Sequence, residues 1–113
     1  MPEERSITAA ELALLDPDGA FSSRLAEDQK LLAELARGLW TAPAEARQPR
    51  LAEIEALAHR LGGAAGTFGY AAVSVAAFDL EARISGGPYR HSVKIDEGLA
   101  ALIRTLDEAL RGC

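Results

Sequence analysis

The chain has 113 residues, and its 12 basic and 17 acidic side chains give a formal net charge of −5. This length fits one domain, which buries roughly two thirds of its unfolded surface and leaves no room for a second catalytic domain. Because no basic stripe follows any predicted helix of this acidic chain, nucleic acid is not an expected partner.

Membrane insertion and secretion are not expected either. The longest uncharged apolar stretch, residues 71–78, is interrupted by Ser74 and is far shorter than a membrane span. The acidic N-terminal sequence lacks the apolar region of a secretory signal. Cys113, the single cysteine, has no partner for an internal disulfide or a metal site. We therefore expect a cytoplasmic protein.

The first predicted element is a short helix that begins at Ala9. Thr8 and Glu11 form the T-x-x-E pattern of a capping box, which satisfies backbone N–H groups at a helix start. The DPDG turn at residues 16–19 ends this helix. We expect it to cover one end of the fold.

A longer helix is predicted over residues 20–40. Its apolar face is formed by Phe21, Leu25, Leu32, Leu35 and Leu39. Asp28 interrupts this stripe and needs a boundary position or a partner. Residues 41–49, rich in Ala and Pro, are predicted to be a connection, after which the next helix begins near Arg50.

In the helix that follows, one histidine lies on the face opposite the apolar stripe. The stripe occupies a sector of roughly 100° and comprises Leu51, Ile54, Leu57, Ala58, Leu61, Ala65 and Phe68. His59 points about 150° away from the centre of this sector. Its neighbours on the outer face are Ala52, Glu55, Ala56, Gly62, Gly63 and Gly66. The imidazole is therefore predicted to stand in water on a shallow patch that a large partner can reach.

Gly62, Gly63 and Gly66 allow two interpretations, since each glycine costs a helix about 1 kcal/mol relative to alanine. In one, the helix ends near Leu61 and the first two glycines form its C-terminal cap. In the other, the helix continues and small residues give access to His59. The apolar positions keep helical phase as far as Phe68, which favours a continuous helix.

Two more helices complete the predicted fold. A helix over residues 70–85 has a narrow stripe of mostly small residues, and the SGGP sequence at 85–88 ends it. Ser92 is the predicted N-cap of the last helix, whose stripe is Ile95, Leu99, Leu102, Leu106 and Leu110. No segment has a strand pattern. We predict an all-α, antiparallel up-down four-helix bundle with a short N-terminal capping helix, one domain over 1–113 with its bundle core at about 20–111.

The spacing around His59 resembles a known signature. Leu61 and Gly63 follow it in the pattern H-x-L-x-G, and Gly69 lies ten residues after the histidine. This motif is similar to that of histidine-containing phosphotransfer (HPt) domains of two-component phosphorelays. Many members of the family carry Lys three residues after the histidine, where this chain has Gly62. Arg60 lies about 100° around the helix and is better placed to reach the rim of a docked partner.

The resemblance implies a phosphocarrier without ATP-dependent activity of its own. His59 would accept a phosphoryl group from the aspartate of a response-regulator receiver domain and pass it to another receiver, with a hybrid sensor kinase as a further partner. Glu81 stands where the family often places a Gln or Glu that hydrogen-bonds the imidazole, although spacing alone favours a solvated glutamate. The docking face would comprise Glu55, Ala56, Arg60, Gly62, Gly63 and Gly66. No cofactor is expected on this chain, and Mg²⁺ would be held by the receiver.

Two other functions stay open at this point. A helical adaptor could bind a receiver through the same smooth face without phosphorylation of His59, and Gly62 in place of Lys supports it. An autonomous enzyme has less support, because the sequence lacks a phosphate-binding loop and zinc-ligand spacing. Trp40 and Phe78 could mark a ligand pocket, but core or boundary packing is the favoured interpretation. His91 is interpreted as a surface histidine. Nothing in the sequence favours a dimer, so we expect a monomer.

Overall fold

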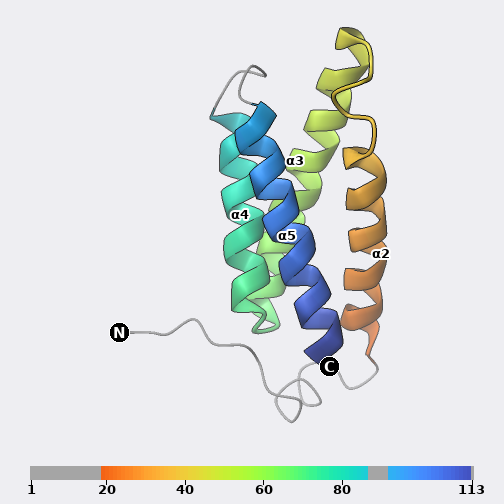
Figure 1. The fold of residues 1–113 in the computed structure, drawn as a ribbon. Coiled ribbons are helices and arrows are strands. Elements are labelled where there is room, and N and C mark those ends of the chain that lie inside the picture. The colour runs from red at the N-terminus through yellow and green to blue at the C-terminus, as the bar shows by residue number, and fades with distance from the viewer. Residues whose placement is uncertain (1–18, 87–91, 113) are drawn as a thin grey trace.

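The computed structural model describes residues 19–86 and 92–112, and this part of the chain contains helices and no strand. The helices are α2 (Ala20–Ala36), α3 (Ala44–Thr67), α4 (Ala71–Ser85) and α5 (Ser92–Gly112) (Figure 1). The prediction of an all-α fold with four long helices is confirmed. The short helix predicted from Ala9 lies outside the described residues.

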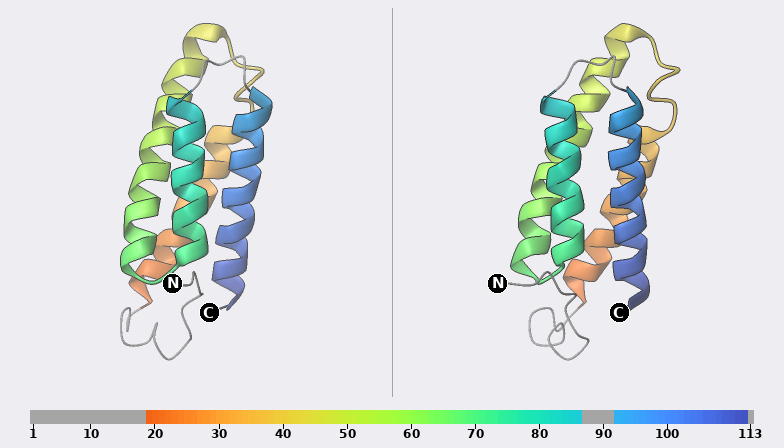
Figure 2. Two further views of the ribbon diagram at one scale, coloured as in Figure 1. Left: turned by 90° about the vertical axis from the view of Figure 1, so that its left-hand side faces the viewer. Right: turned by 60° about the vertical axis from the view of Figure 1, so that its left-hand side comes forward.

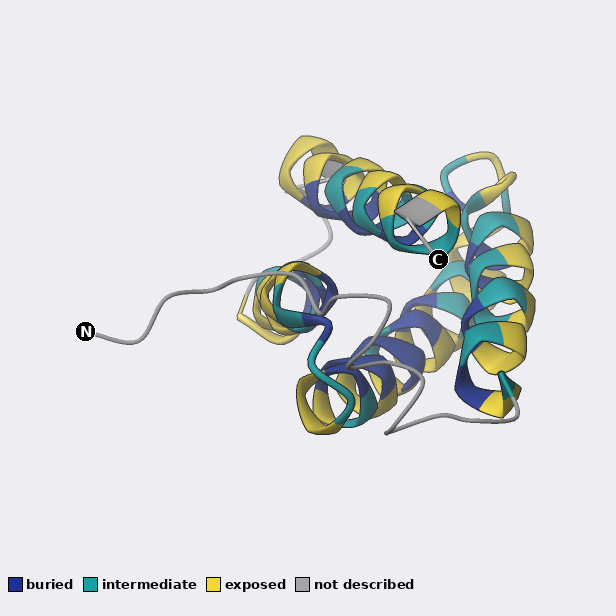
Figure 3. Cartoon of the chain, turned by 90° about the horizontal axis from the view of Figure 1, so that it is seen from below, coloured by how far each residue is buried: buried dark blue, intermediate teal, exposed yellow. Residues whose placement is uncertain are grey.

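The four helices lie side by side around a common interior (Figures 1 and 2). The α3–α4 pair has the most extensive contact, followed by α4–α5, and α2 closes the bundle against α5 and α3. Seen from below, the helices have their buried residues toward the interior of the bundle and their exposed residues on the outside (Figure 3). This two-faced pattern is the one that amphipathic helices produce when their apolar stripes pack together.

The predicted apolar stripes form the core. Every member of the first stripe is buried, from Leu35 at 9% exposure to Leu25 and Leu32 at 0%. The deepest positions of the other helices include Ile54, Leu61, Leu80, Ile95, Leu102 and Leu106, each at most 1% exposed. Burying one such side chain contributes about 1.5–3 kcal/mol to folding. This core fixes the rotation of each helix and therefore decides which residues face solvent.

The connection between α2 and α3 differs from the prediction at both ends. Helix α2 ends at Ala36 rather than near Trp40, because Gly38 adopts a left-handed φ of 75° that no helix continues. Helix α3 begins at Ala44 rather than near Arg50. The prediction was wrong because both prolines were taken as helix breakers, whereas Pro43 precedes the helix and Pro49 lies in its exposed N-terminal part.

Side chains from three segments hold this end of α3. The Arg47 guanidinium donates to the backbone oxygens of Trp40 and Ala42, at 3.3 and 3.0 Å. The Trp40 indole N–H donates to Asp96 Oδ1 of α5 at 2.6 Å. These hydrogen bonds tie the start of α3 to the preceding turn and, through Trp40, to α5.

Helix α3 passes through Gly62, Gly63 and Gly66 and ends at Thr67, so the interpretation in which it stops near Leu61 is wrong. A connection of residues 68–70 then reverses the chain. Gly69 has a φ of 85°, a conformation that only glycine adopts readily, and the Tyr70 N–H donates to the Ala65 oxygen at 2.8 Å. This tight connection places α4 directly against the C-terminal half of α3.

Within 19–86 and 92–112, no helix combines the length and the apolar character that crossing a bilayer requires.

Candidate functional site

His59 lies on the outer face of α3, as its direction from the apolar stripe predicts. Its sequence neighbours Leu57, Ala58 and Leu61 are at most 2% exposed, whereas 70% of the imidazole side chain is accessible to solvent. The core therefore locks the helix in the rotation that turns His59 outward. A ring in this position is open to contact with another macromolecule.

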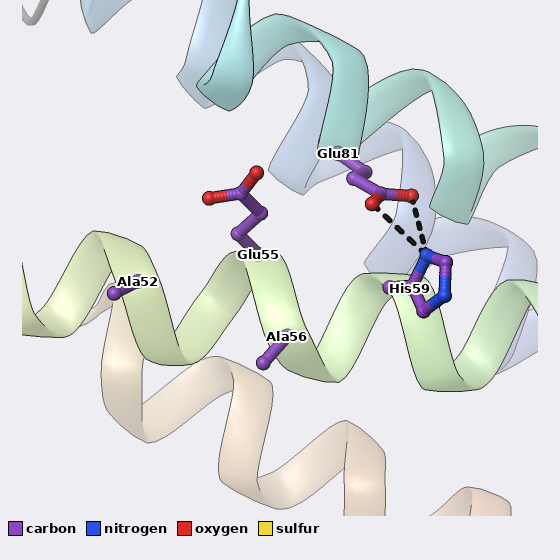
Figure 4. A pocket seen from close by; sticks show the side chains of 5 residues that line it. All are labelled: Ala52, Glu55, Ala56, His59 and Glu81. Carbon is purple, nitrogen blue, oxygen red and sulfur yellow. Dashed lines mark hydrogen bonds and ion pairs between the residues drawn. The ribbon is translucent and has the colours of Figure 1, made fainter.

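Glu81 reaches His59 from the facing helix α4 (Figure 4). Its two carboxylate oxygens lie 3.1 and 3.0 Å from His59 Nδ1. A carboxylate only accepts hydrogen bonds, so Nδ1 carries the proton and the Nε2 lone pair of the neutral ring is free. No residue in the described part of the chain hydrogen-bonds Nε2. One ring nitrogen is therefore fixed and the other is available.

An open depression of about 370 Å³ adjoins the imidazole (Figure 4). Its lining is formed by Ala52, Glu55, Ala56, His59 and Glu81. The two alanines keep this part of the α3 surface low, and the two glutamates come from facing helices. In the described residues, no group of three or more His, Cys, Asp or Glu side chains could hold a metal ion.

A row of α4 side chains covers the glycine-rich part of α3. Ser74, Phe78 and Glu81 are spaced at i, i+4 and i+7, so they share one face of their helix. The Ser74 hydroxyl donates to the Gly62 oxygen at 2.8 Å. The Phe78 ring lies with its centroid 6.1 Å from that of His59, at an interplanar angle of 70°. The α3–α4 contact therefore extends out to the imidazole itself.

Phe78 is the residue of this site that sequence reasoning missed. It was interpreted as core or boundary packing, yet it is 43% exposed and contacts His59. A signal was present in the spacing, because Phe78 lies one turn before Glu81 on the helix that faces His59.

The three glycines beside His59 have different surroundings, which corrects the predicted docking face. Gly62 is buried, and a Cβ there would lie 2.8 Å from atoms of the Phe78 ring. At Gly66 a Cβ would lie 3.4 Å from Ser74 Oγ, whereas at Gly63 it would meet nothing within 4 Å. Gly62 thus serves packing between helices, while Gly63 is the open position.

The remaining predicted docking residues surround the same surface. Ala56 and Arg60 are exposed and Glu55 is half-buried. Arg60 lies toward α2, where partial burial raises the pKa of Asp28 and the charges of Arg60 and Arg24 oppose that rise. This position is consistent with Arg60 meeting the rim of a partner rather than a group bound to the imidazole.

The fold and the site together define a helical bundle with one exposed histidine whose Nδ1 is hydrogen-bonded to a glutamate of the neighbouring helix. The sequence comparison gives the family, because the model of the Hpt domain matches residues 21–112. The chain therefore belongs to the Hpt domain family, whose members carry out phosphotransfer in two-component signalling and interact with receiver domains and kinases. Comparison with curated proteins and with solved structures gave no match.

Proposed function

We propose that His59 is the phosphorylated residue of this domain. In this proposal it accepts a phosphoryl group from a receiver aspartate and passes it to another receiver in a multistep phosphorelay. The observation that supports it is the 3.0 Å contact between His59 Nδ1 and Glu81, made by a ring that is 70% exposed. A nucleophile needs one free lone pair in a defined direction, and this contact leaves Nε2 in that state.

The proposed step forms one bond and breaks one. The Nε2 lone pair attacks phosphorus in line, and the bond between phosphorus and the aspartyl oxygen breaks, so the receiver carboxylate leaves with the electron pair. The imidazole keeps its proton on Nδ1 and gains positive charge. Glu81 stabilises that charge through the hydrogen bond that it already makes. The reverse sequence of bond changes delivers the group to an acceptor aspartate.

Charge on the transferring group must be neutralised mainly by the partner. Phosphoryl transfer depends on positioning and on electrostatic stabilisation of the phosphoryl oxygens. Position 62 offers no cation, because it is a glycine covered by Phe78. We therefore assign this role to Mg²⁺ in the acidic pocket of the receiver.

The proposed docking surface is the solvent-facing side of α3 around His59. Its accessible members are Glu55, Ala56, Arg60, Gly63 and Gly66. Small residues at three of these positions keep the surface low, so a globular partner can bring its aspartyl phosphate up to the ring. A hybrid sensor kinase that carries a receiver would use the same surface.

The proposal also covers the finer organisation of the domain. We take the bundle as antiparallel and up-down, supported by the short connection after Thr67 and by the colour gradients in Figure 1. We also take residues 1–113 as a single domain that acts as a cytoplasmic monomer. Size-exclusion chromatography with light scattering tests the oligomeric state.

The test is a phosphorylation assay on the whole chain. The protein is incubated with a phosphorylated receiver and Mg²⁺, and intact-mass spectrometry is used to detect one added phosphoryl group. The adduct should be acid-labile, base-stable and absent from His59→Gln. An adduct that persists in His59→Gln would contradict the assignment, and so would a set of receivers that bind without producing one.

An adaptor function is the second candidate, because position 62, three residues after His59, holds a glycine covered by Phe78 and not a cation. An adaptor would use the same surface for binding and would not need the imidazole. His59→Gln separates the two functions, since unchanged signalling with retained receiver binding supports the adaptor.

A further inference from the structure

Phe78 is an unusual aromatic residue for this fold because it lies outside the core. Phe21 is 7% exposed, and its ring stacks on that of Phe68 with centroids 4.2 Å apart. Phe78 is 43% exposed and directs its ring at the imidazole of His59. Core packing explains the first two aromatic residues, whereas the position of Phe78 calls for a different explanation.

The Phe78 ring occupies the place that a side chain at position 62 would take. Gly62 lies three residues after His59 on α3, so its Cβ would project beside the imidazole. That Cβ would meet three atoms of the Phe78 ring at 2.8 to 2.9 Å, closer than real Cβ contacts. The side chain that lies next to His59 at this point is therefore Phe78 of α4, and not a side chain of α3 at position 62.

The hydrogen bond to Glu81 does not prevent the imidazole ring from tilting. Nδ1 faces both carboxylate oxygens at nearly equal distance, so the ring can tilt about this contact without losing it. The Phe78 ring stands against the imidazole in an edge-type arrangement, at an interplanar angle of 70°. Such a contact between rings has a preferred geometry and restricts the tilt.

We infer that Phe78 is a positioning residue for His59, with Gly62 providing the space for its ring. This inference rests on the proposed function. It adds that the contact with Phe78 sets the direction in which Nε2 points. Phe78 limits the tilt of the imidazole, and Glu81 fixes the proton on Nδ1. Both residues project from one face of α4, so a single helix orients the nucleophile of its neighbour.

Two phosphodonors distinguish positioning from partner docking. Phosphoramidate is small and needs no protein interface, whereas a phosphorylated receiver needs one. Phe78→Ala should slow phosphorylation of His59 by both donors, each by roughly tenfold, since misplacement of a reacting group is costly for either reaction. Phe78→Tyr keeps the ring and should restore the parental rate. Val75→Ala, which removes another exposed apolar side chain of α4, is the matched control.

Gly62→Ala tests the space that the ring needs. Its added methyl group should displace the Phe78 ring and slow the phosphoramidate reaction as Phe78→Ala does. The double variant Gly62→Ala/Phe78→Ala should then be no slower than Phe78→Ala alone, because the two changes remove the same contact. Gly63→Ala, which meets open space, is the stability control and should raise the melting temperature more than Gly62→Ala does.

An NMR spectrum of histidine-labelled protein gives the readout that a structural role would not change. In the parental chain the His59 ring signals should report one ordered orientation with a protonated Nδ1. In Phe78→Ala they should move and broaden while the melting temperature stays close to parental. Unchanged ring signals and phosphoramidate rates in Phe78→Ala would overturn the inference, as would slowing with the receiver alone. Loss of the adduct in the parental chain would instead overturn the proposed function.

Discussion

Two clusters of hydrogen-bonding side chains involve α3, and they differ in how accessible their reactive atoms are to a partner. Near the start of the helix, one terminal nitrogen of the Arg47 guanidinium donates to the preceding backbone, and the Trp40 indole donates to Asp96 of α5. In the middle of the helix, His59 uses only Nδ1, for Glu81, and 70% of its side chain remains accessible. The first cluster fixes where the helix begins. The second cluster holds one imidazole nitrogen, Nδ1, in a hydrogen bond and leaves the other, Nε2, available to react.

The contrast extends to the residues around each cluster. At the His59 cluster, small residues leave the outer face of α3 low, and the side chains that support the imidazole come from α4. Changes at the two clusters should therefore have separable effects. Those near His59 should affect transfer, and those near Trp40 should affect stability.

The largest effect is expected from Gly63→Leu. Position 63 meets nothing within 4 Å, so a leucine there leaves the bundle intact and projects toward a docked partner. Transfer from a phosphorylated receiver should fall on the order of 100-fold, while far-UV circular dichroism stays unchanged. Gly63→Ala provides a graded comparison with a much smaller loss. A leucine variant that transfers at the parental rate would show that this surface is not the docking face.

Glu81→Ala should produce a smaller loss of transfer. Without the carboxylate, Nδ1 loses its acceptor at 3.0 Å and the positive charge of the reacting ring is no longer offset. We expect a reduction of roughly tenfold in the transfer rate, as for other residues that orient a reacting histidine. Glu81→Gln retains an oxygen acceptor and should lose less. Equal rates for parent and Glu81→Ala would remove Glu81 from the proposed mechanism.

Trp40→Phe should leave transfer unchanged and lower stability. It deletes the indole N–H that donates to Asp96 at 2.6 Å while keeping an aromatic side chain. The expected loss is about 0.5–1.5 kcal/mol in the free energy of unfolding, measured by urea denaturation. Trp40→Phe/Asp96→Ala should lose less than the sum of its single variants. Impaired transfer without a loss of stability would contradict the separation of the two clusters.

The smallest expected effect is a pH dependence at Asp28. Partial burial raises the pKa of this carboxyl from its usual 3.8, so the folded state holds the proton more tightly than the unfolded state. The resulting stabilisation is present below the unfolded pKa and is lost as pH rises through the folded pKa. Asp28→Asn should therefore gain stability relative to the parent over this interval, and the gain should be small because the carboxyl is only partly buried.

Denaturation curves at a series of pH values measure the Asp28 effect. A difference between Asp28→Asn and the parent that is constant with pH, or that favours the parent as pH rises, would contradict the burial argument.

Helical periodicity predicted the features that depend on one helix at a time. The stripe that includes Ile54 and Leu61 is buried except for the half-buried Phe68, and His59 on the opposite side is exposed, because a continuous helix converts spacing into direction. The same phase correctly favoured a helix that continues past Gly62. The position of Glu81 opposite His59 came from family spacing, since spacing alone favoured a solvated side chain.

Features that depend on two helices could not be predicted in the same way. The helical wheel places Gly62 on the outer face but does not show that Phe78 of α4 covers it. The start of α3 was missed because the effect of a proline depends on its position in a helix, and Pro49 lies in an exposed N-terminal part. Both errors concern residues whose role is set by their surroundings rather than by their type.

The most direct test of the account is to locate phosphorus on the histidine ring. The chain contains two histidines, so ¹⁵N-labelled histidine and NMR of the phosphorylated protein identify both the residue and the nitrogen. The account predicts a bond between phosphorus and Nε2 of His59, with the proton retained on Nδ1 beside Glu81. Phosphorus on Nδ1, or on His91, would contradict it.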